Sequence, residues 1–157
     1  MWNEIIPYEE LSLKPEDDVY PIVSMNHFTK RYLHLYVKAE RWMEYDGFSV
    51  IVQMYNGDTY LYDDSENRIR RIKLIDDSSD LTEEEWRNGF SYWLDKEIWI
   101  SRIHKYEIAE YAGISNVQLS RYLNKKITPS TYVTQRLADA IGCDIRDILP
   151  HDFVPLQ

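Results

Sequence analysis

The sequence predicts an α+β chain, in which a small N-terminal module with a three-stranded antiparallel meander and one helix precedes an all-α domain of five helices. Two observations favour this fold class. Residues 48–75 are rich in β-branched and aromatic side chains and contain Asn56-Gly57, a strong hairpin signal. Residues 82–150 instead repeat apolar side chains at a spacing of three to four, as an amphipathic helix does.

Residues 27–43, which precede the meander, fit two structures. Apolar residues from Tyr32 to Met43 recur at helical spacing, but Leu33 to Ala39 also alternates as a strand would. The length and the Lys, Ala, Glu, Arg and Met content favour a helix. We therefore expect one helix here, covering one face of a sheet that is too small to be stable alone.

The meander is predicted as three strands, with Phe48 to Tyr55, Thr59 to Tyr62 and Arg68 to Ile75 as their ranges. A type I′ turn at Asn56-Gly57 would place Val52 opposite Leu61 and Gln53 opposite Tyr60.

Polar, acidic residues without apolar period separate the two halves. We therefore expect an N-terminal module over 1–76, an acidic linker over 77–81, a helical domain over 82–150 and a tail over 151–157. Thr82 and Glu85 have the spacing of a capping box, which predicts a helix beginning there.

Two short helical patterns joined by Gly113-Ile114-Ser115 form the centre of the helical domain. Gly113 supplies the left-handed backbone that ends a helix, and Ser115 is a good N-cap for the next. In that next helix Leu119 and Tyr122 face inward, while the polar residues face outward; these are Asn116, Gln118, Ser120 and Arg121. Such side chains can hydrogen-bond base edges in a DNA major groove.

This half of the chain resembles the lambda-repressor and Cro-like helix-turn-helix family, the XRE type. The matching residues occur in order and cover about the last half of the chain: Ile103, Ile108-Ala109-Glu110, Gly113-Ile114-Ser115, Leu119-Ser120-Arg121-Tyr122, Thr128-Pro129-Ser130, Leu137-Ala138-Asp139-Ala140-Ile141-Gly142 and Asp147-Ile148-Leu149. The chain departs from the family at His104 and Lys105, where Thr or Ser followed by Gln is usual. It also has Lys125 where the family favours Gly, and we expect Asn124 to take the left-handed conformation instead.

The resemblance implies a role for each exposed residue of the two helices. The residues expected to read bases are Asn116, Val117, Gln118 and Arg121. Those expected to contact phosphates are Lys105, Ser115, Asn124, Lys125 and Lys126.

The net charge of −9 is unevenly distributed along the chain. Residues 1–80 carry nine Lys and Arg against 16 Asp and Glu, a net −7, whereas residues 102–136 carry six against two, a net +4. Positive charge therefore coincides with the helix-turn-helix, as DNA binding requires.

Other classes of function find little support. The chain has one Cys and five Gly, with no zinc-ligand spacing, no phosphate-binding Gly loop and no spaced carboxylate pair. No apolar run approaches a membrane span, and the acidic N-terminus has no signal-peptide pattern. We expect a cytoplasmic protein that is not an enzyme and needs no metal or cofactor.

These features lead to a functional hypothesis and one alternative. The hypothesis is a sequence-specific transcription regulator, most simply a repressor of bacterial, phage or mobile-element origin, that binds a palindromic operator in double-stranded DNA as a homodimer. Its N-terminal half would dimerise, sense a ligand or contact a protein. The alternative is a phage-type inhibitor, resembling anti-CRISPR proteins, whose acidic N-terminal half binds a host protein and whose helix-turn-helix serves autoregulation.

Overall fold

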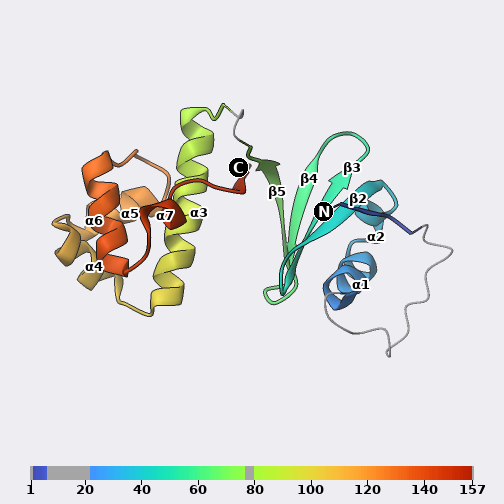
Figure 1. Ribbon diagram of the computed structural model, residues 1–157, viewed down its shortest axis with the longest axis horizontal. Coiled ribbons are helices and arrows are strands. Elements are labelled where there is room, and N and C mark those ends of the chain that lie inside the picture. The colour runs from blue at the N-terminus through green and yellow to red at the C-terminus, as the bar shows by residue number, and fades with distance from the viewer. Residues whose placement is uncertain (1, 7–21, 77–79, 157) are drawn as a thin grey trace. The chain divides into compact units, whose positions relative to one another are not determined.

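The computed structural model describes residues 2–6, 22–76 and 80–156 (Figure 1). The chain divides into two compact units, Met1–Ile72 and Lys73–Gln157. Residues 77–79 of the predicted acidic linker lie outside the described residues.

The sheet of the N-terminal unit is a meander of four strands with a short strand added, whereas three strands were predicted. Every neighbouring pair from β1 to β5 is antiparallel, and the strands lie in chain order. β5 crosses the unit boundary, because its last residues belong to the second unit. The strands are β1 Asn3–Glu4, β2 Ala39–Asp46, β3 Ser49–Met54, β4 Thr59–Asp63 and β5 Arg68–Leu74.

The additional strand of the meander is β2. Its first residues lie within 27–43, for which a single helix was predicted. That prediction is wrong: α1 Ile22–Arg31 and the short α2 Leu33–Tyr36 are followed by β2 from Ala39. The Tyr55 N–H donates to the Lys38 carbonyl, and six residues of β2 then pair with β3. Pairing with a partner strand thus overrides the helical propensity of these residues.

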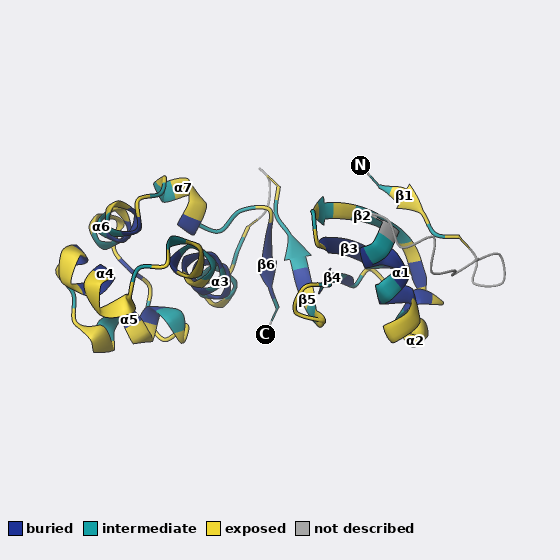
Figure 2. Cartoon of the chain, turned by 90° about the horizontal axis from the view of Figure 1, so that it is seen from below, coloured by how far each residue is buried: buried dark blue, intermediate teal, exposed yellow. Residues whose placement is uncertain are grey.

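One face of the meander forms the core of the N-terminal unit. Alternate residues of β3 and β4, such as Val50, Val52 and Tyr62, are fully buried there. Phe28 of α1 and Tyr36 of α2 pack on them, so the helices cover this face as expected. Figure 2 shows the buried residues of β3.

The β3–β4 hairpin forms around Asn56-Gly57, but with a longer loop than predicted. The Met54 N–H donates to the Asp58 carbonyl at 2.8 Å, and the Gly57 N–H donates back to the Met54 carbonyl at 3.1 Å. Gly57 has φ +97°, and Asn56 does not have a positive φ. The loop is therefore a type I turn followed by a left-handed glycine, in place of a type I′ turn.

The extra loop residue shifts the strand register by one. Val52 lies opposite Tyr60 and Gln53 opposite Thr59, so the predicted pairing with Leu61 and Tyr60 is wrong. The reason is local, since a three-residue loop pairs each β3 residue with the β4 residue one position earlier.

The C-terminal unit contains the five predicted helices. Side chains cap four of them: Thr82 and Asp144 form capping boxes, and Ser115 and Ser130 each accept a backbone N–H. The helices are α3 Glu83–Ser101, α4 Lys105–Ala112, α5 Asn116–Leu123, α6 Thr131–Ile141 and α7 Ile145–Ile148. No helix in the described part of the chain has the length and apolar character needed to cross a bilayer.

The segment after α7, for which the sequence indicated no role, packs on α3. It contains the short strand β6, Phe153–Pro155. Phe153 and Val154 are fully buried, and the Trp93 indole N–H donates to the Phe153 carbonyl. A Cβ at Gly89 would lie 2.6 Å from the Val154 side chain, so α3 needs glycine at this point.

Candidate nucleic-acid interface

The turn between α4 and α5 sets the geometry of the candidate interface. Gly113 ends α4 with φ +78°, and the Ile114 N–H donates to the Ala109 carbonyl at 3.0 Å. Ser115 then begins α5, where its hydroxyl accepts the Gln118 N–H at 3.0 Å. The predicted left-handed glycine and N-cap are therefore confirmed.

The inner faces of α4 and α5 fix the two helices in one core. Ile108 and Ala109 of α4 and Leu119 and Tyr122 of α5 are buried in the same cluster. Tyr122 also packs edge-on against Phe90 of α3, with ring centroids 6.3 Å apart. α5 is therefore held by two other helices, and its outer face stays uncovered (Figure 2).

The outer face of α5 carries most of the predicted base-reading side chains. Asn116, Val117 and Arg121 are exposed, and Val117 keeps 61% of its surface accessible. Gln118 differs, because it is half-buried and its amide donates to the Tyr122 hydroxyl at 2.8 Å. Three side chains are thus free to face a groove, while Gln118 must give up an intrahelical hydrogen bond to do so.

The predicted phosphate-contacting residues lie at the ends of the two helices. Lys105 is the first residue of α4 and is exposed, and its N-cap His104 makes no capping hydrogen bond. The first N–H groups of α4 therefore lack a side-chain acceptor, and such groups favour an anion. Ser115 is exposed but already caps α5.

The loop after α5 corrects one expectation. Asn124 was expected to be left-handed but has φ −95°, whereas Lys125 has φ +63°. Asn124 instead donates its side-chain amide to the Ser120 hydroxyl at 3.1 Å, which holds it in a helix-like conformation. The strained residue is thus the one that occupies the position where glycine is usual. Lys125 and Lys126 are both exposed.

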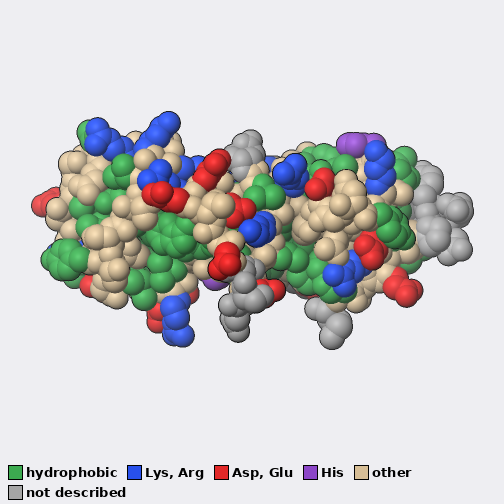
Figure 3. Space-filling view, turned by 90° about the horizontal axis from the view of Figure 1, so that it is seen from above, with side chains coloured by type: hydrophobic (Ala, Val, Ile, Leu, Met, Phe, Trp, Pro, Cys, Tyr) green, Lys and Arg blue, Asp and Glu red, His purple; other side chains and the backbone are tan. Residues whose placement is uncertain are grey.

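Two basic residues behave in ways that the sequence did not indicate. Arg102 caps the end of α3 with φ +59° and is exposed, directly before α4. Arg136 is half-buried: its guanidinium donates to the Tyr111 carbonyl at 2.6 Å and lies 5.1 Å from the Tyr111 ring centre. Arg136 thus joins α6 to α4. On the face in Figure 3, basic and acidic side chains are interspersed.

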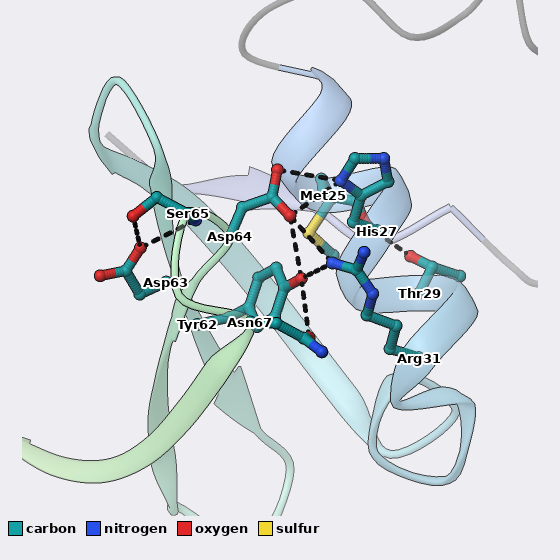
Figure 4. Close-up of polar contacts among 9 residues, drawn as sticks. All are labelled: Met25, His27, Thr29, Arg31, Tyr62, Asp63, Asp64, Ser65 and Asn67. Carbon is teal, nitrogen blue, oxygen red and sulfur yellow. Dashed lines mark hydrogen bonds and ion pairs between the residues drawn. The ribbon is translucent and has the colours of Figure 1, made fainter.

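A separate polar cluster lies in the N-terminal unit (Figure 4). Asp64, after β4, is 2.8 Å from His27 Nδ1 and 2.9 Å from Arg31 Nη1. The Tyr62 hydroxyl accepts from Arg31 and donates to Asp64 at 3.0 Å. His27 and Asp64 lie 37 positions apart in the chain, so their spacing does not reveal the pair.

Electrostatics of this cluster favour a structural role. Burial raises the pKa of Asp64, but hydrogen bonds from His27, Tyr62 and Arg31 outweigh it and hold the pKa below its ordinary value. Burial raises the pKa of Tyr62 to about 12. The polar groups satisfy one another, so the cluster pins α1 to the β4–β5 loop. Among the described residues, no group of three His, Cys, Asp or Glu could hold a metal ion.

Comparison with known proteins places the helix-turn-helix in a family. The family model described as helix-turn-helix matches residues 101–148. Among solved structures, the chain is similar to the crystal structure of a hypothetical transcription factor, NHTF, from Neisseria. That similarity has 18% identity and a TM-score of 0.40, and covers 49% of this chain and 88% of that chain. No curated protein matches the chain. Residues 101–148 are therefore similar to the lambda-repressor-like helix-turn-helix of the XRE type.

Proposed function

We propose that this chain is a sequence-specific DNA-binding regulator that represses transcription. The observation that carries the proposal is the exposed outer face of α5, which is held from behind by α3 and α4. A helix presented in this way can enter a major groove without changing the fold. The family match over residues 101–148 supports the same assignment.

Base reading is assigned to the exposed side chains of α5. Arg121 can donate two hydrogen bonds to guanine O6 and N7, and Asn116 can pair with adenine N6 and N7. Val117 can pack on a thymine methyl group. Gln118 is the weakest reader, because its amide is engaged by Tyr122.

Phosphate binding is assigned to residues on either side of this helix. Lys105 at the start of α4 and Ser115 at the start of α5 would contact the backbone at one edge of the groove. Asn124, Lys125 and Lys126 would contact it beyond the end of α5. These contacts fix register and carry no sequence information, so they should raise affinity for all DNA.

Repression follows most simply from occupancy. A dimer on a palindromic operator, with half-site centres about 34 Å apart, would occlude a promoter that overlaps the site. Such an arrangement suits a regulator of bacterial, phage or mobile-element origin. The N-terminal unit would then supply the dimer contact.

A second candidate function concerns the N-terminal unit. The acidic half of the chain, residues 1–80, carries a net charge of −7. This charge and the exposed Val37, Phe48 and Tyr55 of the unit suit a protein partner. Sedimentation of residues 73–157 beside the full chain separates the two roles. A monomeric fragment with weak operator binding supports dimerisation through residues 1–72. A fragment that dimerises and binds as tightly as the full chain favours the partner-binding role.

Selection from random double-stranded DNA tests the regulator proposal. The full chain should enrich a palindromic motif, and its affinity should fall steeply between about 50 and 200 mM salt because several phosphates are neutralised. Failure to enrich any motif at low salt would contradict the proposal. Repression is tested separately, by a reporter whose promoter overlaps the selected site.

A further inference from the structure

Helix α3 contacts the predicted phosphate-binding loop through residues that lie outside the family match. α3 spans Glu83–Ser101, whereas the helix-turn-helix match begins at residue 101. Two side chains on the first half of α3 nevertheless reach this region, one at the last residue of α5 and one in the loop that follows. Residues outside the family match therefore help to hold this loop.

The first contact is a closed set of hydrogen bonds around Arg87. Its Nε donates to Thr128 Oγ1 at 2.8 Å, and its Nη2 donates to Glu83 Oε1 at 2.7 Å. Thr128 Oγ1 also lies 3.3 Å from the same Glu83 oxygen. Arg87 is thus oriented by a carboxylate on its own helix while it holds a residue 41 positions away.

The second contact lies at the end of α5. The Ser91 hydroxyl, one turn after Arg87 on α3, donates to the Leu123 carbonyl at 2.6 Å. Ser91 is 5% exposed, so this hydrogen bond is protected from water. The two contacts therefore fix the chain at Leu123 and again at Thr128.

The segment between these two points carries Asn124, Lys125 and Lys126. Lys125 is held in a left-handed conformation, which costs free energy for any residue except glycine. A short segment fixed at both ends loses little further entropy when its side chains bind a phosphate. The Lys125 N–H donates to the Tyr122 carbonyl at 3.2 Å and the Lys126 N–H donates to the Arg121 carbonyl at 2.9 Å, so these bonds hold the start of the segment. The contact at Thr128 holds its other end, and losing that contact would loosen the placement of the two ammonium groups.

We infer that Arg87 is a positioning residue for DNA binding: through Thr128 it holds the loop that presents Lys125 and Lys126 to the phosphate backbone. The inference rests on the proposed function. It assigns Arg87 no DNA contact of its own, and it predicts that the effect of Arg87 is transmitted only through the two lysines.

The test compares Arg87→Met with Arg146→Met in the full chain, by titration of the selected operator at several salt concentrations. Methionine keeps the aliphatic stem and removes the guanidinium. Arg146 is the matched control, because it also pairs with a nearby carboxylate but lies on α7 with 83% of its side chain exposed. Both variants lose one positive charge, so long-range electrostatics change alike.

Arg87→Met should lower operator affinity by about three- to tenfold and reduce the slope of log K against log salt by about one, the value for one lost phosphate contact. Arg146→Met should leave the slope unchanged. Thr128→Val removes the hydroxyl that accepts from Arg87 and donates to Glu83. It should reproduce the Arg87→Met result and add nothing to it.

A double-mutant cycle separates positioning from direct contact. In a Lys125→Ala/Lys126→Ala background, Arg87→Met should have no further effect on affinity or salt slope. An additive loss in that background overturns the inference, as does a wild-type salt slope for Arg87→Met in the parent. A wild-type chain that selects no DNA site would overturn the proposed function and this inference together, whereas the other outcomes leave the proposed function standing.

Discussion

The two units hold their elements in place by different means. In the C-terminal unit four of the five helices begin at a side chain that accepts a nearby backbone N–H, and three end at a left-handed residue. In the N-terminal unit α2 begins at Tyr32 without such a cap, and β2 depends on pairing with β3. Local hydrogen bonds set the boundaries in one unit, and pairing between strands sets them in the other.

This difference indicates what each unit can present. A helix fixed by its own caps and by two neighbours gives a rigid outer face, as α5 does. The meander instead depends on the cover of α1, which the cluster around Asp64 pins in place. Substitutions in each unit test this contrast.

Truncating one core side chain in each unit should disturb only that unit. Phe28→Ala should lower the free energy of unfolding by about 3–5 kcal/mol and Ile108→Ala by about 2–5 kcal/mol, since both side chains are fully buried. Amide hydrogen exchange should show lost protection in β2 to β5 for the first and in α4 to α6 for the second. Equal loss in both units for either variant would contradict the division into two units.

Two substitutions at left-handed positions should have opposite effects. Gly113→Ala should destabilise the C-terminal unit by about 1 kcal/mol, because alanine is strained at positive φ. Lys125→Gly should stabilise it by a similar amount while weakening DNA binding, because it relieves strain and removes a cation. Thermal unfolding and operator titration of both variants check the signs. If Lys125→Gly lost stability, the account of strain in this loop would be wrong.

Removing the Ser115 hydroxyl should lower the free energy of unfolding by less than a core truncation does. Its effect should be confined to the start of α5. Ser115→Ala should lower stability by about 1 kcal/mol, because the Gln118 N–H loses its acceptor. Ser115→Asp keeps an acceptor and serves as the matched control in chemical unfolding. If Ser115→Asp lost as much stability as Ser115→Ala, the cap would not be the cause.

Acid should weaken the N-terminal unit through Asp64. Its folded pKa lies below the ordinary 3.8, so the stability it contributes is present above that value and is lost as pH falls through the folded pKa. Asp64→Asn should therefore lower the free energy of unfolding at pH 7. The amide protection of the N-terminal unit should then fall less steeply as the pH falls. Unfolding curves from pH 7 to pH 2 would test this. If the free energy of unfolding of the variant fell with pH as steeply as that of the parent, other carboxylates would be the cause of the acid dependence.

Shortening the β3–β4 loop should have the smallest effect. Deletion of Tyr55, which is 74% exposed, leaves Asn56-Gly57 as a two-residue turn without changing the pairing of Met54 and Asp58. Stability should change by less than about 1 kcal/mol, because Asn-Gly suits a type I′ turn. Chemical unfolding measures the change, and strand cross-peaks in NMR spectra should keep Val52 opposite Tyr60.

The sequence was sufficient for the helical unit because its signals are local. Thr82, Gly113 and Ser115 each act within four residues of their position, and each acts as predicted. The exposed face of α5 was predicted from the helical spacing of the apolar residues on its inner face. What the sequence missed there, the contact of Arg87 with Thr128, joins residues 41 positions apart.

The N-terminal unit was harder to predict because its decisive interactions are distant or ambiguous. Residues 39–46 have the composition of a helix, and only pairing with β3 makes them a strand. One additional loop residue at Tyr55 shifted the whole register. The polar cluster of the N-terminal unit joins His27 to Asp64, which lie 37 positions apart. Neither spacing nor composition reveals such a partner.

The central claim is that α5 reads bases while its flanks bind phosphates, and one measurement tests it most directly. Arg121→Ala and Lys105→Ala would be titrated against the selected operator and against all of its single-base variants. Arg121→Ala should cost about 1–3 kcal/mol on the operator and remove discrimination at one base pair, whereas Lys105→Ala should weaken every sequence about equally. The same uniform loss for both variants would contradict the claim.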